Sequence, residues 1–294
     1  MTTNSLPEKD ASGALVGANE PPSLGAALVQ LQKRQRFIHS TKVTFVWLVL
    51  VAALMGGLLL IRFQPQYMLE HYDIILQGAG ATLFVSLTSI LIATLLALFG
   101  SIARLSSSAI AQGISGFYVS VVRGTPLLIQ IYVIYLGLPQ IGTQLIKFGY
   151  PELGRLFIMD AIPAGILALS LNYGAYMTEI FRAGLQSIGH GQREAAIALG
   201  MNQWQVLRRI ILPQAVRIVI PDIGNQFIAM QKDSALISIM GVWEITYLAT
   251  RYAKKDSRYM EMFFLAAGAY WILTIISTWF QTRLEKRMER AYER

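Results

Sequence analysis

The chain has 294 residues, of which 54% are hydrophobic and only 14% are charged, and its mean hydropathy is +0.47. A soluble globular protein carries about 25% charged residues, so this chain has too little polar surface for an ordinary soluble enzyme. The absence of cysteine excludes disulfide scaffolds and cysteine-based metal or nucleophilic sites. The net charge of +8 raises the question of nucleic acid binding, which the distribution of the basic residues answers.

The N-terminal part of the chain changes character near residue 41. Residues 1–41 are rich in Ser, Gly, Pro and Ala, and we expect a largely disordered N-terminal tail. The uncharged run Val43–Ile61 follows, and it is long enough to cross a bilayer, since about 20 apolar residues span the hydrocarbon core. Residues 42–74 are therefore interpreted as an N-terminal transmembrane helix and its loop. A cleavable signal peptide is the competing interpretation, but the run starts late and exceeds the usual length of roughly 7–15 residues.

Five further segments are candidates for membrane spans. The first and last are clean apolar runs, whereas Pro, Gly, Arg123 or Asp222 interrupt the three between them. Interrupted helices are stable at membrane depth only where neighbouring protein or a water-lined cavity satisfies the freed backbone groups, so we expect a bundle. The predicted fold is therefore all-α, a polytopic transmembrane helical bundle of about six spans. The five segments are Ile75–Ala103, Val119–Leu138, Asp160–Met177, Pro213–Met230 and Met260–Thr282.

An even number of spans places both termini on one side of the membrane, and the basic residues indicate which side. The two tails and the loops on their side carry roughly twice as many Lys and Arg residues as the opposite loops. Both termini are therefore predicted to be cytoplasmic, with residues 284–294 as a basic C-terminal tail. Membrane insertion also accounts for the net charge without nucleic acid. The basic cluster Arg251–Arg258 is the weak point of this topology.

The longest hydrophilic stretch between the spans covers residues 182–209, on the predicted cytoplasmic side. Gly191 can cap a short helix whose third residue is Glu194, where the carboxylate can reach back to the cap amide. Gly200 is the expected left-handed terminator of this helix. Asn202, three residues before a Gln, repeats the capping pattern for a second helix. Two short capped helices would make a rigid knob on the membrane surface.

One string in this stretch matches a known motif: Glu-Ala-Ala, three residues, Gly, nine residues, Ile, one residue and Leu-Pro. It resembles the EAA loop of the membrane permease subunits of bacterial ABC importers. In that family the loop forms a coupling helix that docks into a groove on a separate cytoplasmic ATPase. For Glu194, helix capping and a contact with the ATPase are compatible roles. The resemblance implies a coupling loop over residues 182–213 whose ATPase-coupling residues are Glu194, Ala195, Ala196, Gly200, Ile210, Leu212 and Pro213.

Three flanking segments narrow the resemblance to the polar amino acid branch, which imports histidine, glutamine, arginine, glutamate and opines. These segments are Arg123–Leu128, Ala175–Arg182 and Gln231–Leu236. The resemblance covers about residues 75–283 and implies a five-helix transmembrane core, to which residues 42–74 add one helix. It implies a bacterial inner-membrane importer with a second permease subunit (a homodimer or a paralogue heterodimer), ABC ATPase subunits and an extracytoplasmic solute-binding protein.

The chain lacks the Gly-x-x-x-x-Gly-Lys-Ser/Thr loop that cradles nucleotide phosphates. We therefore expect no cofactor in this chain, with ATP and Mg bound by the partner ATPase subunit. His-Glu-x-x-His and Gly-x-Ser-x-Gly motifs are also absent, so we expect a transport subunit that is not itself an enzyme and has no metal site. An ATP-independent secondary amino acid transporter or channel is the alternative, and it would have no need of the hydrophilic stretch 182–209.

Polar residues in or beside the predicted spans are the candidates for a substrate pathway. A zwitterionic amino acid needs a cation or a helix N-terminus for its carboxylate and an acceptor for its ammonium group. Ionisable residues inside a membrane are costly, which makes function the default hypothesis for them. The structural alternatives are interhelical hydrogen bonds and, for Glu179, an intrahelical ion pair with Arg182. The candidates are Arg123, Gln130, Asn172, Tyr173, Tyr176, Glu179, Lys232 and Asp233.

Overall fold

The computed structural model describes residues 39, 41–53, 55–57, 63–188 and 190–290. The chain divides into two units, Met1–Phe63 and Gln64–Arg294. In the first unit the described residues form an apolar helix, Thr41–Gly57, whose large apolar side chains are exposed. Residues 1–38 and 40 of the predicted N-terminal tail, residues 54 and 58–61 of the first predicted span, and residues 291–294 of the predicted C-terminal tail lie outside the described residues.

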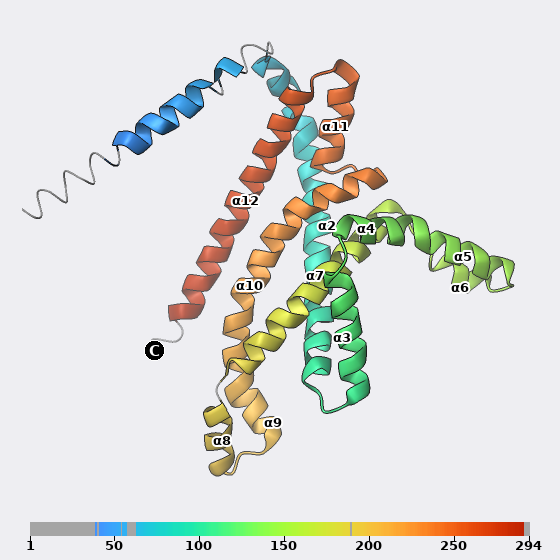
Figure 1. Ribbon diagram of the computed structural model, residues 1–294, viewed down its shortest axis with the longest axis vertical. Helices are drawn as coiled ribbons and strands as arrows, with labels where there is room; N and C mark the ends of the chain where they lie inside the picture. The colour runs from blue at the N-terminus through green and yellow to red at the C-terminus, as the bar shows by residue number, and fades with distance from the viewer. Residues whose placement is uncertain (1–38, 40, 54, 58–62, 189, 291–294) are drawn as a thin grey trace, which may run out of the picture. The chain divides into compact units, whose positions relative to one another are not determined.

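Every regular element described in the second unit is a helix, which confirms the all-α prediction (Figure 1). The chain order is α2 (Pro65–Leu105), α3 (Ala109–Arg123), α4 (Leu127–Tyr132), η1 (Val133–Gly137), α5 (Leu138–Lys147), α6 (Pro151–Arg155), α7 (Ala161–Gln186), α8 (His190–Ala198), α9 (Gln203–Val206), η2 (Leu207–Ile211), α10 (Leu212–Asp233), η3 (Ser234–Met240), α11 (Ile245–Asp256) and α12 (Tyr259–Arg290).

Helices α2 and α7 pack closely because small residues line their contact. A Cβ atom added to Gly100 of α2 would collide with Thr178 Oγ1 of α7. A Cβ atom on Gly174 of α7 would lie 3.0 Å from the Leu96 Cβ atom of α2. Small residues let two helix backbones approach in this way without a large apolar interface. The buried cluster around this pair includes Val85, Ala93, Ala97, Ala168, Leu169 and Met177.

The predicted span Val119–Leu138 is wrong, because the chain turns inside it. Helix α3 ends at Arg123, and residues 124–126 separate it from α4. Pro126 has no backbone N–H, and a residue before proline is disfavoured in the helical region, so one helix does not run through this point. The apolar helical run that replaces the predicted span covers Leu127–Lys147.

The other four predicted spans of this unit fall on observed helices. Helices α2 and α12 extend beyond both predicted bounds, α7 starts one residue after the predicted Asp160 and extends beyond the predicted end, and the predicted span Pro213–Met230 lies inside α10. By length and composition, three described helices could cross a membrane: Pro65–Leu105, Leu127–Lys147 and Tyr259–Met288. The total of about six spans stays a prediction.

One helical run is continuous from residue 203 to residue 240, through α9, η2, α10 and η3. Its π-helical turn η2 comes directly before Leu212–Pro213, just as the π-helical turn η1 comes directly before Leu138–Pro139. In an α-helix a proline ring collides with the carbonyl four residues back. The π turn changes this register, because the Leu212 N–H bonds to the Leu207 carbonyl, five residues back. The helix therefore passes its proline without ending.

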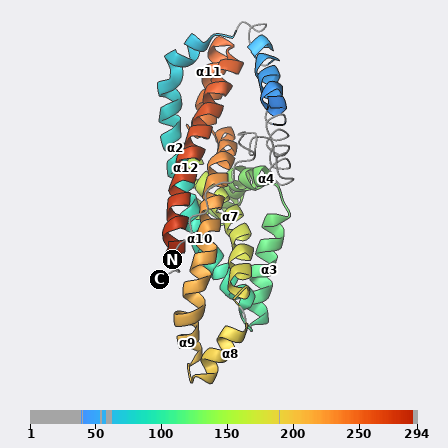
Figure 2. The ribbon, with the colours of Figure 1, turned by 90° about the vertical axis from the view of Figure 1, so that its left-hand side faces the viewer.

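Helix α11 occupies a segment that the charge pattern assigned to a loop. Its buried residues Ile245, Leu248, Ala249 and Ala253 belong to one apolar cluster with residues of α2 and α12. The buried Glu244 caps it, since the carboxylate accepts hydrogen bonds from the Thr246 and Tyr247 amides at 2.9 Å and 2.6 Å. Both ribbon views place α11 at the end of this unit opposite α8 and α9 (Figures 1 and 2).

Candidate functional site

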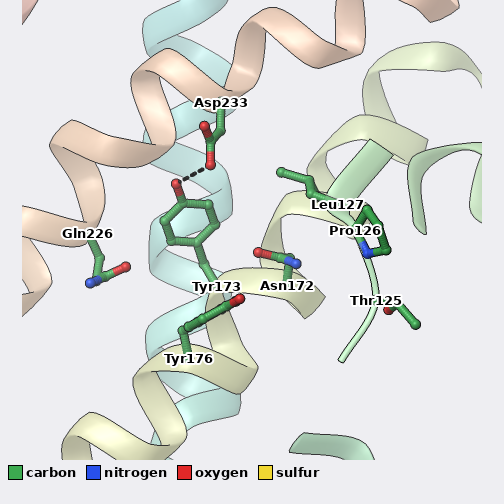
Figure 3. Close-up of a pocket in the computed structure, with 8 residues that line it drawn as sticks. All are labelled: Thr125, Pro126, Leu127, Asn172, Tyr173, Tyr176, Gln226 and Asp233. Carbon is green, nitrogen blue, oxygen red and sulfur yellow. Dashed lines mark hydrogen bonds between the residues drawn. The ribbon is translucent and has the colours of Figure 1, made fainter. Parts of the chain in front are cut away.

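A pocket of about 320 Å³ lies between the turn at residues 124–126, helix α7 and helix α10 (Figure 3). Ligand pockets typically measure about 300–1,000 Å³, so this one suits a small molecule. Some of the predicted substrate-pathway residues line it, from α7 and from the last residue of α10. They are Asn172, Tyr173, Tyr176 and Asp233.

A hydrogen bond between Tyr173 and Asp233 joins two walls of the pocket. The Tyr173 hydroxyl donates to Asp233 Oδ2 at 2.8 Å. Tyr173 is buried, with 4% of its surface exposed, whereas Asp233 is exposed. A carboxylate has about four acceptor positions on its two oxygens, and this bond occupies one of them. Asp233 therefore keeps acceptor capacity toward a ligand while Tyr173 fixes its orientation.

Gln130 of α4 holds the turn that forms the opposite wall. Its Nε2 donates to the Val122 carbonyl at 2.7 Å and to the Thr125 hydroxyl at 2.9 Å. Its Oε1 accepts from Asn172 Nδ2 of α7 at 3.1 Å. Gln130 does not line the pocket. The structure therefore shows the structural alternative for this residue, which is an interhelical hydrogen bond. Asn172 makes this bond and also lines the pocket.

Arg123 lies beside the pocket at the end of α3. Its guanidinium carbon is 5.3 Å from the centroid of the Tyr176 ring, within the range of a cation–π contact. Tyr176 lines the pocket and is 41% exposed. In Figure 3 the Tyr173 ring lies between Tyr176 and Asp233. The pocket therefore has a carboxylate at one end and a guanidinium behind the aromatic ring at the other.

Glu179 and Lys232 do not line this pocket. Glu179 Oε2 accepts from Arg182 at 2.7 Å, which confirms the predicted intrahelical ion pair. Glu179 Oε1 also lies 3.3 Å from Arg104 Nε, so the pair extends to the C-terminal end of α2. Lys232 is exposed. Of the eight candidates, four therefore line the pocket, and Arg123 and Gln130 lie beside it through their contacts with Tyr176 and Asn172.

Four lining residues were not predicted: Thr125, Pro126, Leu127 and Gln226. The first three lie inside the segment Arg123–Leu128, which served only to identify the family branch. The family resemblance of this segment was therefore the only sequence feature that pointed to these three residues. Gln226 is a polar residue in a predicted membrane span, and its polarity at that depth was the signal for it.

Helices α8 and α9 form the predicted knob. Helix α8 starts at His190, so Gly191 lies within it, and the prediction that Gly191 caps it is wrong. The prediction for its other end is confirmed, since Gly200 has a φ of +80°. The Gly200 N–H bonds to the Ile197 carbonyl at 2.9 Å, and the Met201 N–H bonds to the Ala196 carbonyl at 3.1 Å. This pair of bonds is the Schellman termination that glycine favours.

The capping box predicted for α9 is also present. Asn202 Oδ1 accepts from the Gln205 N–H at 2.9 Å, and Gln205 Oε1 accepts from the Asn202 N–H at 2.9 Å. A further hydrogen bond of 2.6 Å runs from Gln214 Nε2 on α10 to Gln192 Oε1 on α8. The knob is therefore a hydrogen-bonded body fixed to the start of α10.

The knob presents both polar and apolar side chains outward. Glu194 and Ala195 are exposed, whereas Ala196 is buried. Leu199 is 84% exposed and Trp204 is 67% exposed. Large apolar side chains gathered on an exposed element are typical of a surface that binds another protein. The remaining predicted coupling residues, in η2 and the first residues of α10, are Ile210, Leu212 and Pro213.

The chemistry available in the pocket is that of binding and orientation. It offers hydroxyl groups, amides and one carboxylate, with a guanidinium close by. Within the part of the chain that the structure describes, no group of three His, Asp or Glu residues could hold a metal ion. These groups can bind and orient a small polar molecule through hydrogen bonds.

Comparisons with known proteins agree with this architecture. Residues 96–290 match the family described as binding-protein-dependent transport system inner membrane component. The probable amino-acid permease protein YxeN of Bacillus subtilis is 36% identical over 227 residues, which cover 77% of this chain and 96% of YxeN. The octopine transport system permease protein OccM of Rhizobium radiobacter is 36% identical over 223 residues, which cover 76% of this chain and 89% of OccM.

A solved structure gives the same result in three dimensions. The crystal structure of an amino acid ABC transporter with histidines superposes with a TM-score of 0.67 at 32% sequence identity. The match covers 76% of this chain and 98% of that one. The family match spans α7, the knob and α10, which are the elements that form the pocket and the exposed loop. The chain therefore belongs to the family of inner membrane components of binding-protein-dependent transport systems.

Proposed function

We propose that this protein is the permease subunit of an ATP-driven ABC importer that moves polar amino acids across the bacterial inner membrane. One observation carries the proposal: the continuous helical run from residue 203 to residue 240 joins the exposed knob to Asp233 in the pocket. Family membership favours this function over an ATP-independent secondary transporter or channel. The names of the relatives, which are amino acid and octopine permeases, support the class of substrate.

Energy comes from separate ATPase subunits, which bind ATP and Mg and contact the knob. The exposed Leu199 and Trp204 offer apolar contacts, and the exposed Glu194 offers a polar one. When the ATPase dimer closes, it would draw the two knobs of the assembled permease together. Because α8 follows α7 closely and α9 continues into α10, the bundle would rock between inward-facing and outward-facing states.

The assembly would contain a second permease subunit, identical or paralogous, and an extracytoplasmic solute-binding protein. Both termini would lie in the cytoplasm, on the side of the knob. The excess of Lys and Arg in the tails and in the loops of that side supports this orientation.

Within the pocket, Asp233 would accept the ammonium group of the substrate, and Arg123 would bind its carboxylate. Tyr173 holds Asp233 by its 2.8 Å hydrogen bond, and Arg123 already lies against the Tyr176 wall. Hydrogen bonds between charged partners are stronger than neutral ones, so these two contacts would supply most of the selectivity for a zwitterion. Glu179 is paired with Arg182 and Arg104, and it would stabilise the bundle instead.

Reconstitution tests the importer function. The full chain, its candidate ATPase and its solute-binding protein are placed in proteoliposomes, and ATP hydrolysis and uptake are measured over a panel of polar amino acids. We expect uptake to require ATP and the substrate to stimulate hydrolysis. Uptake at full rate by this chain alone, driven by an ion gradient, would contradict the proposal.

A matched pair of variants tests the pocket separately. Asp233→Asn removes the proposed acceptor, whereas Asp222→Asn makes the same change on the same helix at a residue that does not line the pocket. We expect Asp233→Asn to raise the KM for uptake by about 10- to 100-fold, since a hydrogen bond to a charged group contributes about 1.5–3 kcal/mol. Basal ATP hydrolysis should not change. Equal effects of the two variants would reject the pocket and leave the importer function standing.

A further inference from the structure

Helix α11 carries a second pocket, of about 280 Å³, which Arg251, Tyr252 and Lys255 line. Arg251 and Lys255 are four residues apart on a helix, so they lie on the same face, one turn apart. Among the described residues, neither has a carboxylate oxygen within ion-pair distance. The pocket therefore brings together two cations that no acidic side chain neutralises.

The acidic residues nearest in the chain have other partners. Asp256 Oδ2 accepts a hydrogen bond of 2.7 Å from the Tyr67 hydroxyl of α2. Glu261 Oε1 accepts from the Gln64 amide at 3.1 Å and lies 3.4 Å from Arg258 Nη1. These contacts hold α11 against the start of α2 and α12. They leave the positive charge of the pocket available to an external anion.

Each of the two cations lies against an aromatic ring. The Arg251 guanidinium carbon lies 4.7 Å from the centroid of a Trp243 ring, and Lys255 Nζ lies 5.9 Å from the Tyr252 ring. Tyr252 in turn meets His71 of α2, with ring centroids 5.6 Å apart. Trp243 is 58% exposed. Exposed Trp and Tyr next to Lys and Arg are typical of the boundary between a membrane and water.

The position of the pocket along α2 indicates the same boundary. His71 lies one turn before Ile75, where the apolar stretch of α2 begins. The exposed Tyr259 and Phe263 lie in the first two turns of α12, at the same end of the bundle. Both helices are long and apolar enough to span a membrane. The pocket therefore lies where the lipid phosphates of one leaflet would be.

We propose that this pocket binds the phosphate of an anionic phospholipid headgroup, with Arg251 and Lys255 as the groups that contact it. A volume of about 280 Å³ admits a headgroup, and the surrounding aromatic rings suit the boundary between headgroups and acyl chains. The proposal also explains why Arg251 and Lys255 lie on the predicted non-cytoplasmic side, where the loops carry fewer Lys and Arg residues than those on the cytoplasmic side. It does not depend on the substrate pocket or on the partner ATPase.

Native mass spectrometry of the full-length protein in detergent tests the proposal, with phosphatidylglycerol or phosphatidylcholine added in equal amounts. We expect the wild type to retain phosphatidylglycerol preferentially and Arg251→Gln/Lys255→Gln to bind it about 30-fold more weakly, from the usual contribution of two cations at an anionic membrane surface. Lys147→Gln/Lys254→Gln, which removes the same charge outside the pocket, and Arg251→Lys/Lys255→Arg should both bind like the wild type. If the first double variant does not fold, the two single variants carry the test, each with about a fivefold loss.

Three results would overturn the proposal. The first is equal retention of phosphatidylglycerol by wild type and Arg251→Gln/Lys255→Gln. The second is displacement of the lipid by an equal concentration of inorganic phosphate, which would assign the pocket to a free anion. The third is loss of solute-binding-protein docking in this variant with unchanged lipid retention, which would assign the basic face to a protein partner.

Discussion

The proposed substrate pocket and the knob are held together by different kinds of contact. In the pocket, Tyr173 bonds to Asp233 and Asn172 bonds to Gln130, pairs that are 60 and 42 residues apart in the chain. In the knob, the capping box at Asn202 and the termination at Gly200 close within a few residues. The pocket therefore depends on the packing of several helices, whereas the knob keeps its shape by itself. Substitutions should separate these two behaviours.

The largest effect is expected where α2 packs against α7. Gly100→Ala places a methyl group against the buried Thr178 hydroxyl, so the helices must separate. We expect a loss of about 1–3 kcal/mol in the free energy of unfolding, as for other overpacked interiors. Unfolding in mixed detergent micelles measures it. Uptake should fall with it, because Tyr173 and Tyr176 lie on the same helix as Thr178.

A second substitution provides the control. Thr178→Ala removes the hydroxyl and methyl groups that collide, so the double variant Gly100→Ala/Thr178→Ala should recover part of the lost stability. Additive losses in this double-mutant cycle would show that the close approach of the two helices is not the cause.

A substitution in the knob should change coupling and leave stability alone. Glu194→Ala removes an exposed carboxylate at the proposed contact with the ATPase. We expect the amount of substrate imported per ATP to fall several-fold, while the unfolding midpoint stays within error. Glu152→Ala, at a side chain that is 84% exposed on α6, is the matched control. If Glu194→Ala lowered the thermal stability and left the coupling unchanged, Glu194 would have a structural role and the prediction would be wrong.

Gln130→Leu should act between these extremes. It removes the acceptor of Asn172 Nδ2 and the donor that Gln130 offers to the Val122 carbonyl and the Thr125 hydroxyl, so the turn beside the pocket loses its anchor. We expect the KM for uptake to rise about five- to tenfold, because a lost hydrogen bond costs about 1–1.5 kcal/mol. Basal ATP hydrolysis should not change. Gln140→Leu, on an exposed position of α5, should leave the KM unchanged, and an equal rise in both variants would deny Gln130 a positioning role.

The smallest effect is expected at the cap of α9. Asn202→Ala removes the side-chain oxygen that accepts from the Gln205 N–H and keeps the backbone N–H that bonds to Gln205 Oε1, and this loss costs about 1 kcal/mol of local helix stability. Hydrogen exchange of residues 203–206 should become faster while the rest of the bundle is unchanged. Asn202→Ser keeps a cap and should exchange like the wild type. Faster exchange along the whole of α10 would show that the knob does not hold its shape locally.

The sequence was most informative where structure is local. The positive φ at Gly200 and the Asn202 box follow from residue types three or four positions apart, and both are found. A cap at Gly191 predicts that α8 starts at Gln192, whereas α8 begins two residues earlier, at His190. Helix ends are predicted from neighbouring residues along the chain, and an error of one or two positions is normal for them.

The pocket was less predictable, because no local sequence pattern predicts which helices will pack together to form it. Asn172 and Asp233 were identified as polar residues near spans, whereas Gln226, a polar residue within a predicted span, was not. The predicted span Val119–Leu138 joined two apolar runs across Pro126, where the missing N–H and the restricted residue before proline interrupt the helix. Helix α11 was predicted as a loop because its basic residues indicated an exposed segment, whereas only Ile245, Leu248, Ala249 and Ala253 form its buried face.

The uninterrupted helix from residue 203 to residue 240 constrains the lengths that this segment can have. Each residue inserted into an α-helix rotates everything beyond it by about 100°. One residue added or removed between the knob and Asp233 would therefore point that carboxylate away from Tyr173, even though every chemical group were kept. A change of three or four residues, which is close to a whole turn, would preserve the alignment of the two ends. A one-residue change would preserve it only where a π turn such as Leu207–Ile211 is gained or lost with it, because that turn accommodates the extra residue. Functional relatives should differ in length in their tails and loops and keep this spacing.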